Sequence, residues 1–192
     1  MPFQLLAESL KYFSASFLIL SLLGCEYIFG SKPGSNAYPV KRISDGDTIT
    51  VTDSSGKDIS VRFACVDAPE VPHTNKEKNS KKMVDQNQFK WGEKARVRLQ
   101  QLIKQGNNNV KLTVTDTDQY GRKVSEIRLP DGTFVQEVLT KEGLVQFYKP
   151  YKKDCPSADI VEKAEADAKK RRVGVWRDTT YVSAWEWRRN NK

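Results

Sequence analysis

Histidine and cysteine are scarce in this chain of 192 residues, and that scarcity excludes several kinds of site. The one histidine is His73, so any mechanism that needs two histidine side chains is excluded. The chain has no C-x-x-C pair and no cysteine–histidine set with the spacing of zinc ligands. It also lacks a Walker A loop, a G-x-G-x-x-G turn and a G-x-S-x-G elbow. Acidic side chains, and basic residues near them, are therefore the candidates for chemistry.

The N-terminal segment carries the one long apolar run. "FSASFLILSLL", residues 13–23, is uncharged and almost entirely apolar or small, which suits the core of a signal peptide better than a full membrane span. The run ends in "LLGC", which resembles a bacterial lipobox, the motif whose cysteine is acylated and becomes the new N-terminus. We predict a signal peptide with a lipobox over residues 1–25, with the lipid on Cys25. A plain cleaved signal and an uncleaved anchor are the alternatives.

Composition predicts how the rest of the chain is divided. "GSKPGSNAYP" is rich in glycine, proline, serine and asparagine, which indicates a flexible tether over residues 26–37. The 38% of hydrophobic and 29% of charged residues are typical of one soluble domain plus an appendage. We place the domain at residues 38–178 and a C-terminal tail at 179–192. "WEWRR" in this tail, residues 185–189, is interpreted as packed or frayed rather than as a platform for bases.

The excess of basic residues points to a polyanionic partner. Lysines and arginines number 32 against 24 acids, a net charge of +8. Removal of residues 1–25 takes away one base, Lys11, and one acid, Glu8, so the charge stays at +8. Such a balance favours nucleic acid or an anionic membrane surface, although a merely basic soluble protein is the alternative.

A signal segment places the protein outside the cytoplasm of a bacterium, either anchored by lipid or secreted. After Cys25, two cysteines remain, Cys65 and Cys155. In an oxidising compartment an even pair favours a disulfide over two free thiols.

Apolar alternation and turn residues predict short strands separated by turns. Strands are expected at 38–44, 47–52, 59–66 and 109–115, and at the start of 123–135. Helices are expected at 89–106, 135–143 and 157–176, with Gly106, Gly143 and Gly174 at their ends. The polar segment 71–88 is interpreted as a mobile surface loop. The predicted fold class is α+β, a small Greek-key barrel of the OB type with about three helices.

Two aspartates flank a glycine in "RISDGDTITV". Asp45-Gly46 before an alternating run is typical of a hairpin turn, because both residues tolerate positive φ. The chain repeats this turn in "RLPDGTFV", where Thr133 follows instead of an acid. The turn therefore explains Asp45 and Gly46 but not Asp47.

Asp47, Asp67 and Glu70 stand at the ends of neighbouring predicted strands. If 47–52 and 59–66 pair as a hairpin, Asp47 lies opposite Asp67, and two such charges repel unless a cation lies between them. Pro69 keeps the chain extended, so that Glu70 can project into the same cavity. Oxygen ligands favour Ca²⁺ or Mg²⁺. Taken singly, each acid has the alternative of being a solvated turn residue.

Arginines accompany these acids. Arg62 precedes Asp67 on the same strand, and "QYGR" delivers Tyr120 and Arg122 at a turn. A cation, a carboxylate that acts on water and two guanidinium groups are what hydrolysis of a phosphodiester requires.

Four segments in this order, "DGDT", "VRFACVDAPE", "DQYGR" and "EGLVQFY", resemble the signature segments of the thermonuclease, or staphylococcal-nuclease-like, family. The resemblance covers roughly residues 38–176. It implies an OB-fold, Ca²⁺-dependent phosphodiesterase that cuts DNA and RNA, here expected to be a monomer. It also implies which residues bind the metal, act on water and contact the phosphate. Calcium ligands are Asp47, Asp67 and the backbone carbonyl of Ala68, with Asp45 beside them; Glu70 acts on water; Arg62 and Arg122 act on the phosphoryl group; Tyr120 lies beside Arg122, and Tyr148 or Tyr151 contacts the phosphate.

The chain departs from the family pattern at three places. Ala68 replaces a threonine, which matters little for a backbone ligand. Gln119 replaces a lysine that helps to hold a 3′ end, which puts action on ends in doubt. The segment 71–88 is longer than usual. The alternative to an enzyme is an OB-fold module that binds nucleic acid without cutting it, although such a module has no need of acids that repel its ligand.

Overall fold

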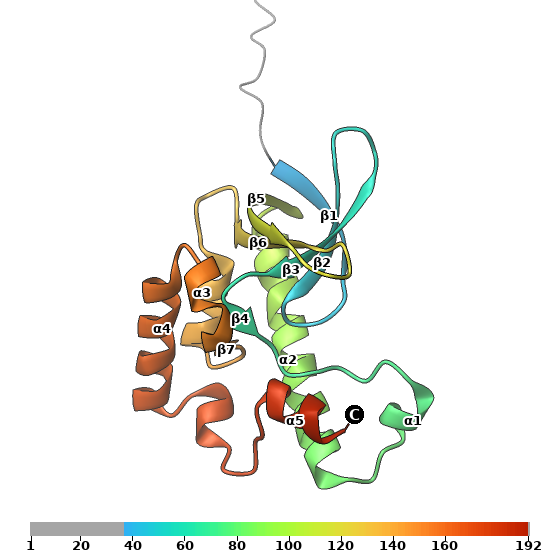
Figure 1. Ribbon diagram of the computed structural model, residues 1–192, viewed down its shortest axis with the longest axis vertical. Helices are drawn as coiled ribbons and strands as arrows, with labels where there is room; N and C mark the ends of the chain where they lie inside the picture. The colour runs from blue at the N-terminus through green and yellow to red at the C-terminus, as the bar shows by residue number, and fades with distance from the viewer. Residues whose placement is uncertain (1–36, 192) are drawn as a thin grey trace, which may run out of the picture. The chain divides into compact units, whose positions relative to one another are not determined.

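The structure, a computed structural model, describes residues 37–191 (Figure 1). The predicted signal peptide with Cys25, and the tether up to residue 36, lie outside these residues. Within the described part of the chain, no helix is both long enough and apolar enough to cross a membrane. The lipobox therefore stays a prediction.

Five strands close into a barrel, as the apolar alternation predicts. They are β1 (Ala37–Ile43), β2 (Thr48–Thr52), β3 (Asp58–Phe63), β5 (Asn109–Thr117) and β6 (Lys123–Arg128), in the order β1-β2-β3-β6-β5. Neighbouring strands are antiparallel except β3 and β6, which run parallel. Ile49, Val51 and Val61 on β2 and β3 are fully buried in the core. The α+β class and the barrel are confirmed.

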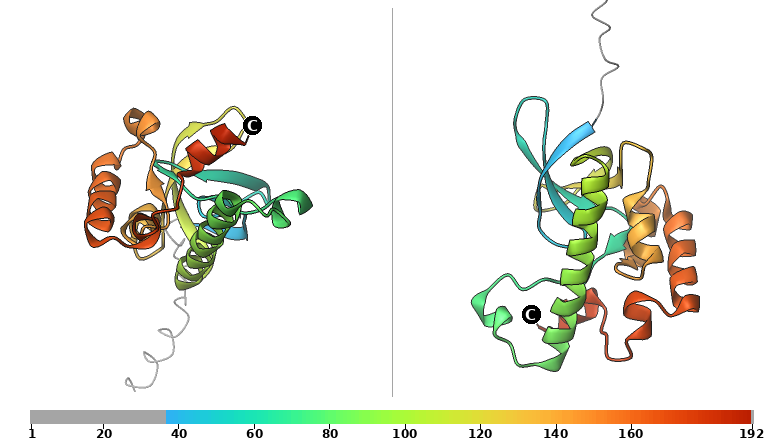
Figure 2. Two further views of the ribbon diagram at one scale, coloured as in Figure 1. Left: turned by 90° about the horizontal axis from the view of Figure 1, so that it is seen from below. Right: turned by 180° about the vertical axis from the view of Figure 1, so that it is seen from behind.

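Five α-helices occur in the described residues, where about three were predicted. They are α1 (Asn75–Lys78), α2 (Met83–Gln105), α3 (Val135–Lys141), α4 (Ala158–Arg171) and α5 (Ala184–Asn190), with short 3₁₀ segments η1 (Lys149–Asp154) and η2 (Gly174–Arg177). The long helix α2 runs along the barrel, and α3 and α4 pack side by side (Figure 1 and Figure 2). The helices that were not predicted are α1 and α5.

The prediction of one loop over residues 71–88 is wrong. Thr74 and Glu77 form a reciprocal capping box that starts α1. The helix α2 begins at Met83 rather than at residue 89. Its added first turns bury two polar residues, Asp85 and Gln88. An apolar pattern could not predict these turns because polar side chains make the buried contacts.

The glycine expected to end the last predicted helix has a different function. The helix α4 ends at Arg171, and the next residue, Arg172, takes the left-handed conformation with φ +51°. Gly174 has φ +58°, and a Cβ there would lie 2.1 Å from the carbonyl oxygen of Gly143. Two backbone segments therefore meet at Gly174 with no room for a side chain.

The segment predicted as a tail contains α5, which packs on the N-terminal half of α2. The Trp187 Nε1 donates to Asp85 Oδ1 at 2.9 Å, and its ring meets Phe89 edge-on at 5.7 Å. In the segment before α5, Asp178 Oδ2 accepts from Nε1 of Trp91 on α2 at 2.8 Å. Figure 2 shows α5 lying against α2 in the view from behind. Of the two interpretations of "WEWRR", packing holds for Trp187.

A second, two-stranded sheet joins β4 (Val66–Asp67) to β7 (Gln146–Phe147). The turn from β3 into β4 contains Cys65 with φ +72°, a conformation that residues other than glycine rarely adopt. A disulfide joins Cys65 to Cys155, with the Cα atoms 5.2 Å apart. The pair expected from the cysteine count is therefore joined, and it ties the turn before β4 to the segment before α4.

Candidate active site

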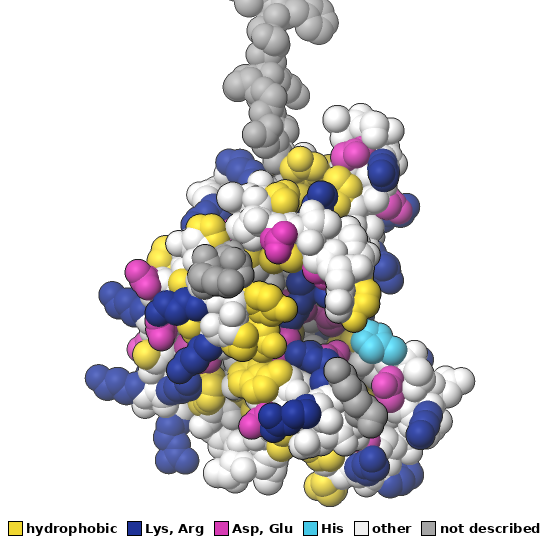
Figure 3. Space-filling model, in the orientation of Figure 1, with side chains coloured by type: hydrophobic (Ala, Val, Ile, Leu, Met, Phe, Trp, Pro, Cys, Tyr) yellow, Lys and Arg dark blue, Asp and Glu magenta, His cyan; other side chains and the backbone are white. Residues whose placement is uncertain are grey.

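The residues that the sequence singled out line one pocket of about 960 Å³, within the usual range for ligand sites. Figure 3 shows it as a recess in which basic and acidic side chains gather beside His73, drawn in cyan. The predicted residues that line it are Asp45, Asp47, Arg62, Asp67, Ala68, Glu70, Tyr120, Arg122, Tyr148 and Tyr151. The structure therefore brings every predicted metal, catalytic and substrate residue to one place.

The glycine of "DGD" serves packing rather than a turn with positive φ. Gly46 is absent from the described residues with positive φ, whereas Gly132 in "PDG" has φ +94°. A Cβ on Gly46 would lie 2.6 Å from the Cβ of Ala95 and 2.9 Å from that of Ala68. The expected explanation of Gly46 is therefore wrong. This residue lets the loop before β2 approach both α2 and the segment after β4.

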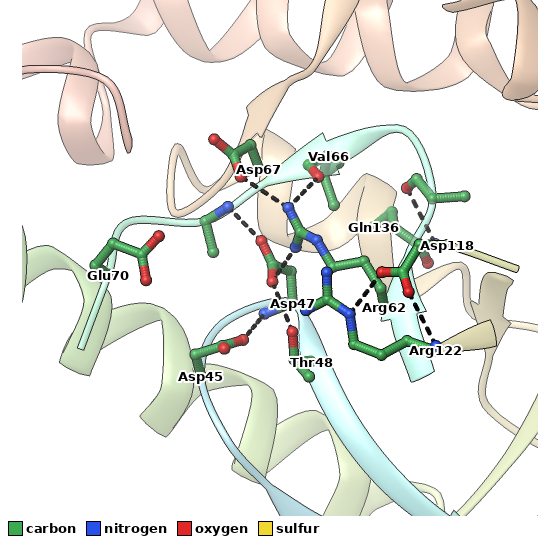
Figure 4. A network of polar contacts seen from close by, with 12 residues as sticks. Asp45, Asp47, Thr48, Arg62, Val66, Asp67, Glu70, Asp118, Arg122 and Gln136 are labelled. Carbon is green, nitrogen blue, oxygen red and sulfur yellow. Dashed lines mark hydrogen bonds and ion pairs between the residues drawn. The ribbon is translucent and has the colours of Figure 1, made fainter. Parts of the chain in front are cut away.

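Asp47 is held from two sides. Its Oδ1 forms an ion pair with Arg62 Nη1, and its Oδ2 accepts from the backbone N–H of Ala68 (Figure 4). The backbone carbonyl of Asp47 accepts from Phe63 N at 2.8 Å, so that β2 and β3 pair as expected. The Asp47 N–H in turn donates to Asp45 Oδ1 at 2.9 Å. The Asp47 carboxylate is thus fixed between β3 and the segment after β4.

Asp67 lies between two arginines and is 1% exposed. Arg62 Nη2 donates to its Oδ1 at 2.7 Å, and Arg188 Nη2 donates to its Oδ2 at 2.7 Å. Arg188 uses its other amino group, Nη1, to pair with Glu70 Oε1. Figure 4 shows Arg62 between the two aspartates. The two aspartates meet at Arg62, whose guanidinium group lies between them, but Asp67 stands on β4 and not, as expected, on the strand that pairs with β2.

Burial controls the protonation of these acids. Burial, together with the neighbouring Asp47 charge, raises the pKa of Asp45 to about 7. Burial also opposes ionisation of Asp47, but Arg62 prevails and lowers the pKa of that carboxyl. For Asp67 and Glu70, burial prevails over the adjacent arginines and the pKa of each is raised. The charged forms of Asp45, Asp67 and Glu70 are therefore disfavoured by their burial, whereas that of Asp47 is stabilised by Arg62.

Arg122 reaches the same pocket without touching these acids. The turn before it bends at Gly121, with φ +78°, and Arg122 Nε donates to Asp118 Oδ2 at 2.7 Å. The guanidinium lies 5.5 Å from the ring centroid of Tyr120, within the range of a cation–π contact. Tyr120 is 75% exposed. This arginine is therefore positioned by a carboxylate on its own turn.

An aromatic cluster forms another wall of the pocket. The ring centroids of Tyr148 and Tyr151 are 5.2 Å apart, and those of Tyr148 and Trp185 are 5.8 Å apart. All three side chains line the pocket, and Tyr151 is 59% exposed. Exposed aromatic faces of this kind stack on bases.

The structure adds pocket residues that the sequence did not indicate. Trp185 and Arg188 come from α5, and Asp118 holds Arg122. The one hint in the sequence was the aromatic and basic composition of "WEWRR". His73 is an exposed loop residue at the edge of the pocket, with its Nε2 4.0 Å from Glu70 Oε2.

A different group of potential ligand atoms is excluded as a metal site. Within residues 37–191, Cys65, Cys155 and Glu126 are the group whose ligand atoms lie within 4.8 Å of one another. The two cysteines form the disulfide, so no thiolate is present. Glu126 instead accepts from the backbone N–H and the hydroxyl of Ser157, at 2.7 and 3.0 Å.

Comparisons with known proteins agree with this geometry. A family model described as "Staphylococcal nuclease homologue" matches residues 60–178. The chain belongs to the staphylococcal nuclease family, as the four sequence segments indicated. The match begins after Asp47 and ends before α5.

Individual relatives support the same assignment. The chain is 30% identical over 161 residues to a micrococcal nuclease of Shigella flexneri, with 80% of each chain covered. It is 29% identical over 157 residues to an uncharacterized endonuclease of Haemophilus influenzae, which covers 82% of this chain and 75% of the relative. A prophage-derived endonuclease of Bacillus subtilis is 33% identical over 143 residues, 74% of this chain but 44% of the relative.

Proposed function

We propose that this protein is a Ca²⁺-dependent phosphodiesterase that hydrolyses DNA, RNA or both outside the cytoplasm. The observation that carries the proposal is the meeting of Asp47, Asp67 and Glu70 with Arg62 and Arg122 in one pocket. Membership of a nuclease family supports it. The five-stranded barrel supports the OB type, a fold whose strand face and loops bind oligonucleotides.

The donor set of the pocket fits a hard divalent cation. Asp47 and Asp67 offer buried carboxylate oxygens, and oxygen ligands are what Ca²⁺ prefers. The raised pKa of Asp67 indicates that a further positive charge is favourable there. Asp47, Asp67 and the Ala68 carbonyl would hold the ion, with Asp45 orienting Asp47 through its backbone N–H. When bound, Ca²⁺ would supply positive charge against the phosphate.

The chain's own side chains would carry the proton and the developing charge. Glu70 would accept a proton from the attacking water, and its raised pKa makes it a better base than an ordinary glutamate. Arg62 and Arg122 would donate to the phosphate oxygens as negative charge grows on them. Arg62 now contacts carboxylates and Arg122 contacts Asp118, so each would share its donors between these partners and the phosphate.

The aromatic side chains would hold the nucleic acid beside the phosphate. Tyr120, Tyr148 and Tyr151 line the pocket, and Trp185 extends the stacking surface. The neutral Gln119 also lines it, in the place of a lysine expected to hold a chain end. We therefore infer endonucleolytic action, in line with several relatives that are named endonucleases.

Location and assembly complete the proposal. The disulfide supports an oxidising compartment, and the lipobox hypothesis gives the mature protein a membrane anchor at acylated Cys25. The protein would act as a monomer.

Cys25→Ser should abolish labelling by a radioactive fatty acid and release the protein from the membrane. Mass spectrometry that finds unlipidated protein cut at another site would refute the anchor but not the nuclease.

The nuclease proposal is tested with purified protein on supercoiled plasmid and on RNA. Both should be degraded with millimolar Ca²⁺ and remain intact once EDTA is added. Glu70→Gln is the matched control, because it removes the proposed base and changes the side chain least. A wild-type protein that leaves both substrates intact with Ca²⁺, yet retards them on a gel, would establish the alternative of a binding module.

A further inference from the structure

Arg188 connects two acids that have separate roles in the proposed mechanism. Its Nη2 donates to Asp67 Oδ2 at 2.7 Å, and its Nη1 pairs with Glu70 Oε1. We propose that Arg188 is a positioning residue, which holds the Glu70 carboxylate at a fixed place relative to Asp67. The inference rests on the proposed function, and Arg188 lies beyond the end of the family match at residue 178.

The shape of the guanidinium suits this task. Its two amino groups point from one rigid plane, and each contacts a different carboxylate. The distance between Glu70 and Asp67 is therefore set by one planar group. A water-activating carboxylate needs such support, since a small displacement of a catalytic group costs a large part of the rate.

The fold holds Arg188 in place through α5. The neighbouring Trp187 is buried, with its Nε1 on Asp85. The side-chain amide of Gln88 also links this region: in the orientation that satisfies both of its polar atoms, its oxygen accepts from Glu70 N at 3.2 Å and its nitrogen donates to Val182 O at 3.0 Å. The same helix α2 thus positions both the backbone of Glu70 and the start of α5.

Asp67 has a second support besides Arg188, so the effect of losing Arg188 on Asp67 can be told apart from its effect on Glu70. Its Oδ1 accepts from Arg62 at 2.7 Å, so that Asp67 keeps one guanidinium when Arg188 is removed. Within residues 37–191, Glu70 pairs with no second arginine, and the other basic side chain beside it is His73, whose Nε2 lies 4.0 Å from Glu70 Oε2. Loss of Arg188 should therefore disturb Glu70 more than Asp67.

The first test compares Arg188→Ala with wild type in the full chain. We expect kcat to fall about 10- to 100-fold, as for other residues that orient a site through its ligands, with KM for DNA within about three-fold. Calorimetric titration with Ca²⁺ alone should give a Kd no weaker than that of wild type, because a competing positive charge has left Asp67.

Arg98→Ala is the matched control. Arg98 also makes a two-pronged ion pair, with Glu142, but it lies outside the pocket. This variant should keep kcat and KM while it loses a two-pronged ion pair of its own. If Arg188→Ala does not fold, Arg188→Lys takes its place: it keeps the charge, loses the planar fork and should have a kcat below that of wild type.

A double-mutant cycle decides whether Arg188 acts through Glu70. In the Glu70→Gln background, removal of Arg188 should cost no more than about three-fold in kcat, because the group that it positions is already disabled. Full additivity, an unchanged kcat in the single variant, or Ca²⁺ binding weakened more than three-fold would each overturn the inference. A wild-type protein without turnover would overturn the proposed function itself, and the positioning role of Arg188 with it.

Discussion

Asp47 and Glu70 share one pocket but differ in what surrounds them. Asp47 is buried against Arg62 and the Ala68 N–H, whereas Glu70 is partly exposed and contacts Arg188. The structure thus separates an acid suited to hold a cation from an acid that water can reach. Substitution of each by its amide should give different defects.

Asp47→Asn should lose Ca²⁺ affinity and activity together, because a neutral amide is a poor ligand for a hard cation. Glu70→Gln should bind Ca²⁺ nearly as wild type does but lose about 100-fold or more in kcat, since the amide is a far poorer base. Calorimetry with Ca²⁺ and initial rates on plasmid measure the two effects. Equal loss of metal binding in both variants would contradict the division of roles.

Gly92 gives a second prediction at the scale of the residue. A Cβ there would lie 2.0 Å from the carbonyl oxygen of Glu70 and 2.7 Å from that of Pro69. Alanine favours a helix by about 1 kcal/mol over glycine, but overpacking costs roughly 1–3 kcal/mol, so we expect Gly92→Ala to destabilise the protein. Urea unfolding measures the change, with the exposed Lys104→Ala on the same helix as control. A Gly92→Ala variant as stable as wild type would show that the Glu70 segment yields freely.

At the scale of the element, α5 is a helix that forms where the sequence predicted a tail. The barrel strands were predictable because alternation is local. The meeting of Asp47 with Asp67 also needs the turn at Cys65, which carries the chain from β3 into β4, and this turn was not predicted. The contacts of Arg188 join residues 118 and 121 positions apart, and no local pattern encodes such a pairing. The first turns of α2 were not predicted for the same reason, since their buried Asp85 contacts Trp187, which is 102 positions away in the sequence.

Trp187→Ala should therefore affect both stability and catalysis. Truncation of a buried tryptophan costs about 3–5 kcal/mol, and here it would also release the helix that carries Arg188. Limited proteolysis should cut residues 179–191 faster in the variant, and kcat should fall. Trp187→Phe keeps an aromatic ring but loses the hydrogen bond to Asp85, so it should lose less stability than Trp187→Ala. If proteolysis is unchanged in Trp187→Ala, the docking of α5 does not depend on this side chain.

At the scale of the whole molecule, the disulfide ties the turn before β4 to the segment before α4. It closes a loop of 90 positions, for which chain entropy allows about 4 kcal/mol, a large part of the stability of an ordinary domain. Cys65 also forms the turn that leads to Asp67. We expect the double variant Cys65→Ala/Cys155→Ala to unfold at a lower urea concentration than the oxidised wild type. Reductant should lower the wild-type midpoint and leave that of the variant unchanged; equal midpoints without reductant would contradict a stabilising bridge.

The net charge of +8 and the acid cluster act in opposite directions on nucleic acid. The basic surface should bind a single strand, and log K should fall with log [salt] with a slope of about −0.7 for each phosphate neutralised. The buried acids oppose a phosphate at the pocket until a cation neutralises them. Binding of a fluorescent oligonucleotide to Glu70→Gln should therefore weaken with salt and become tighter when Ca²⁺ is added. Asp47→Asn/Glu70→Gln should keep the salt dependence and lose the effect of Ca²⁺. Anisotropy titrations at several salt concentrations, with and without Ca²⁺, measure the salt dependence and the Ca²⁺ dependence of binding. If the affinity of Glu70→Gln for the oligonucleotide does not change with Ca²⁺, the phosphate binds away from these acids.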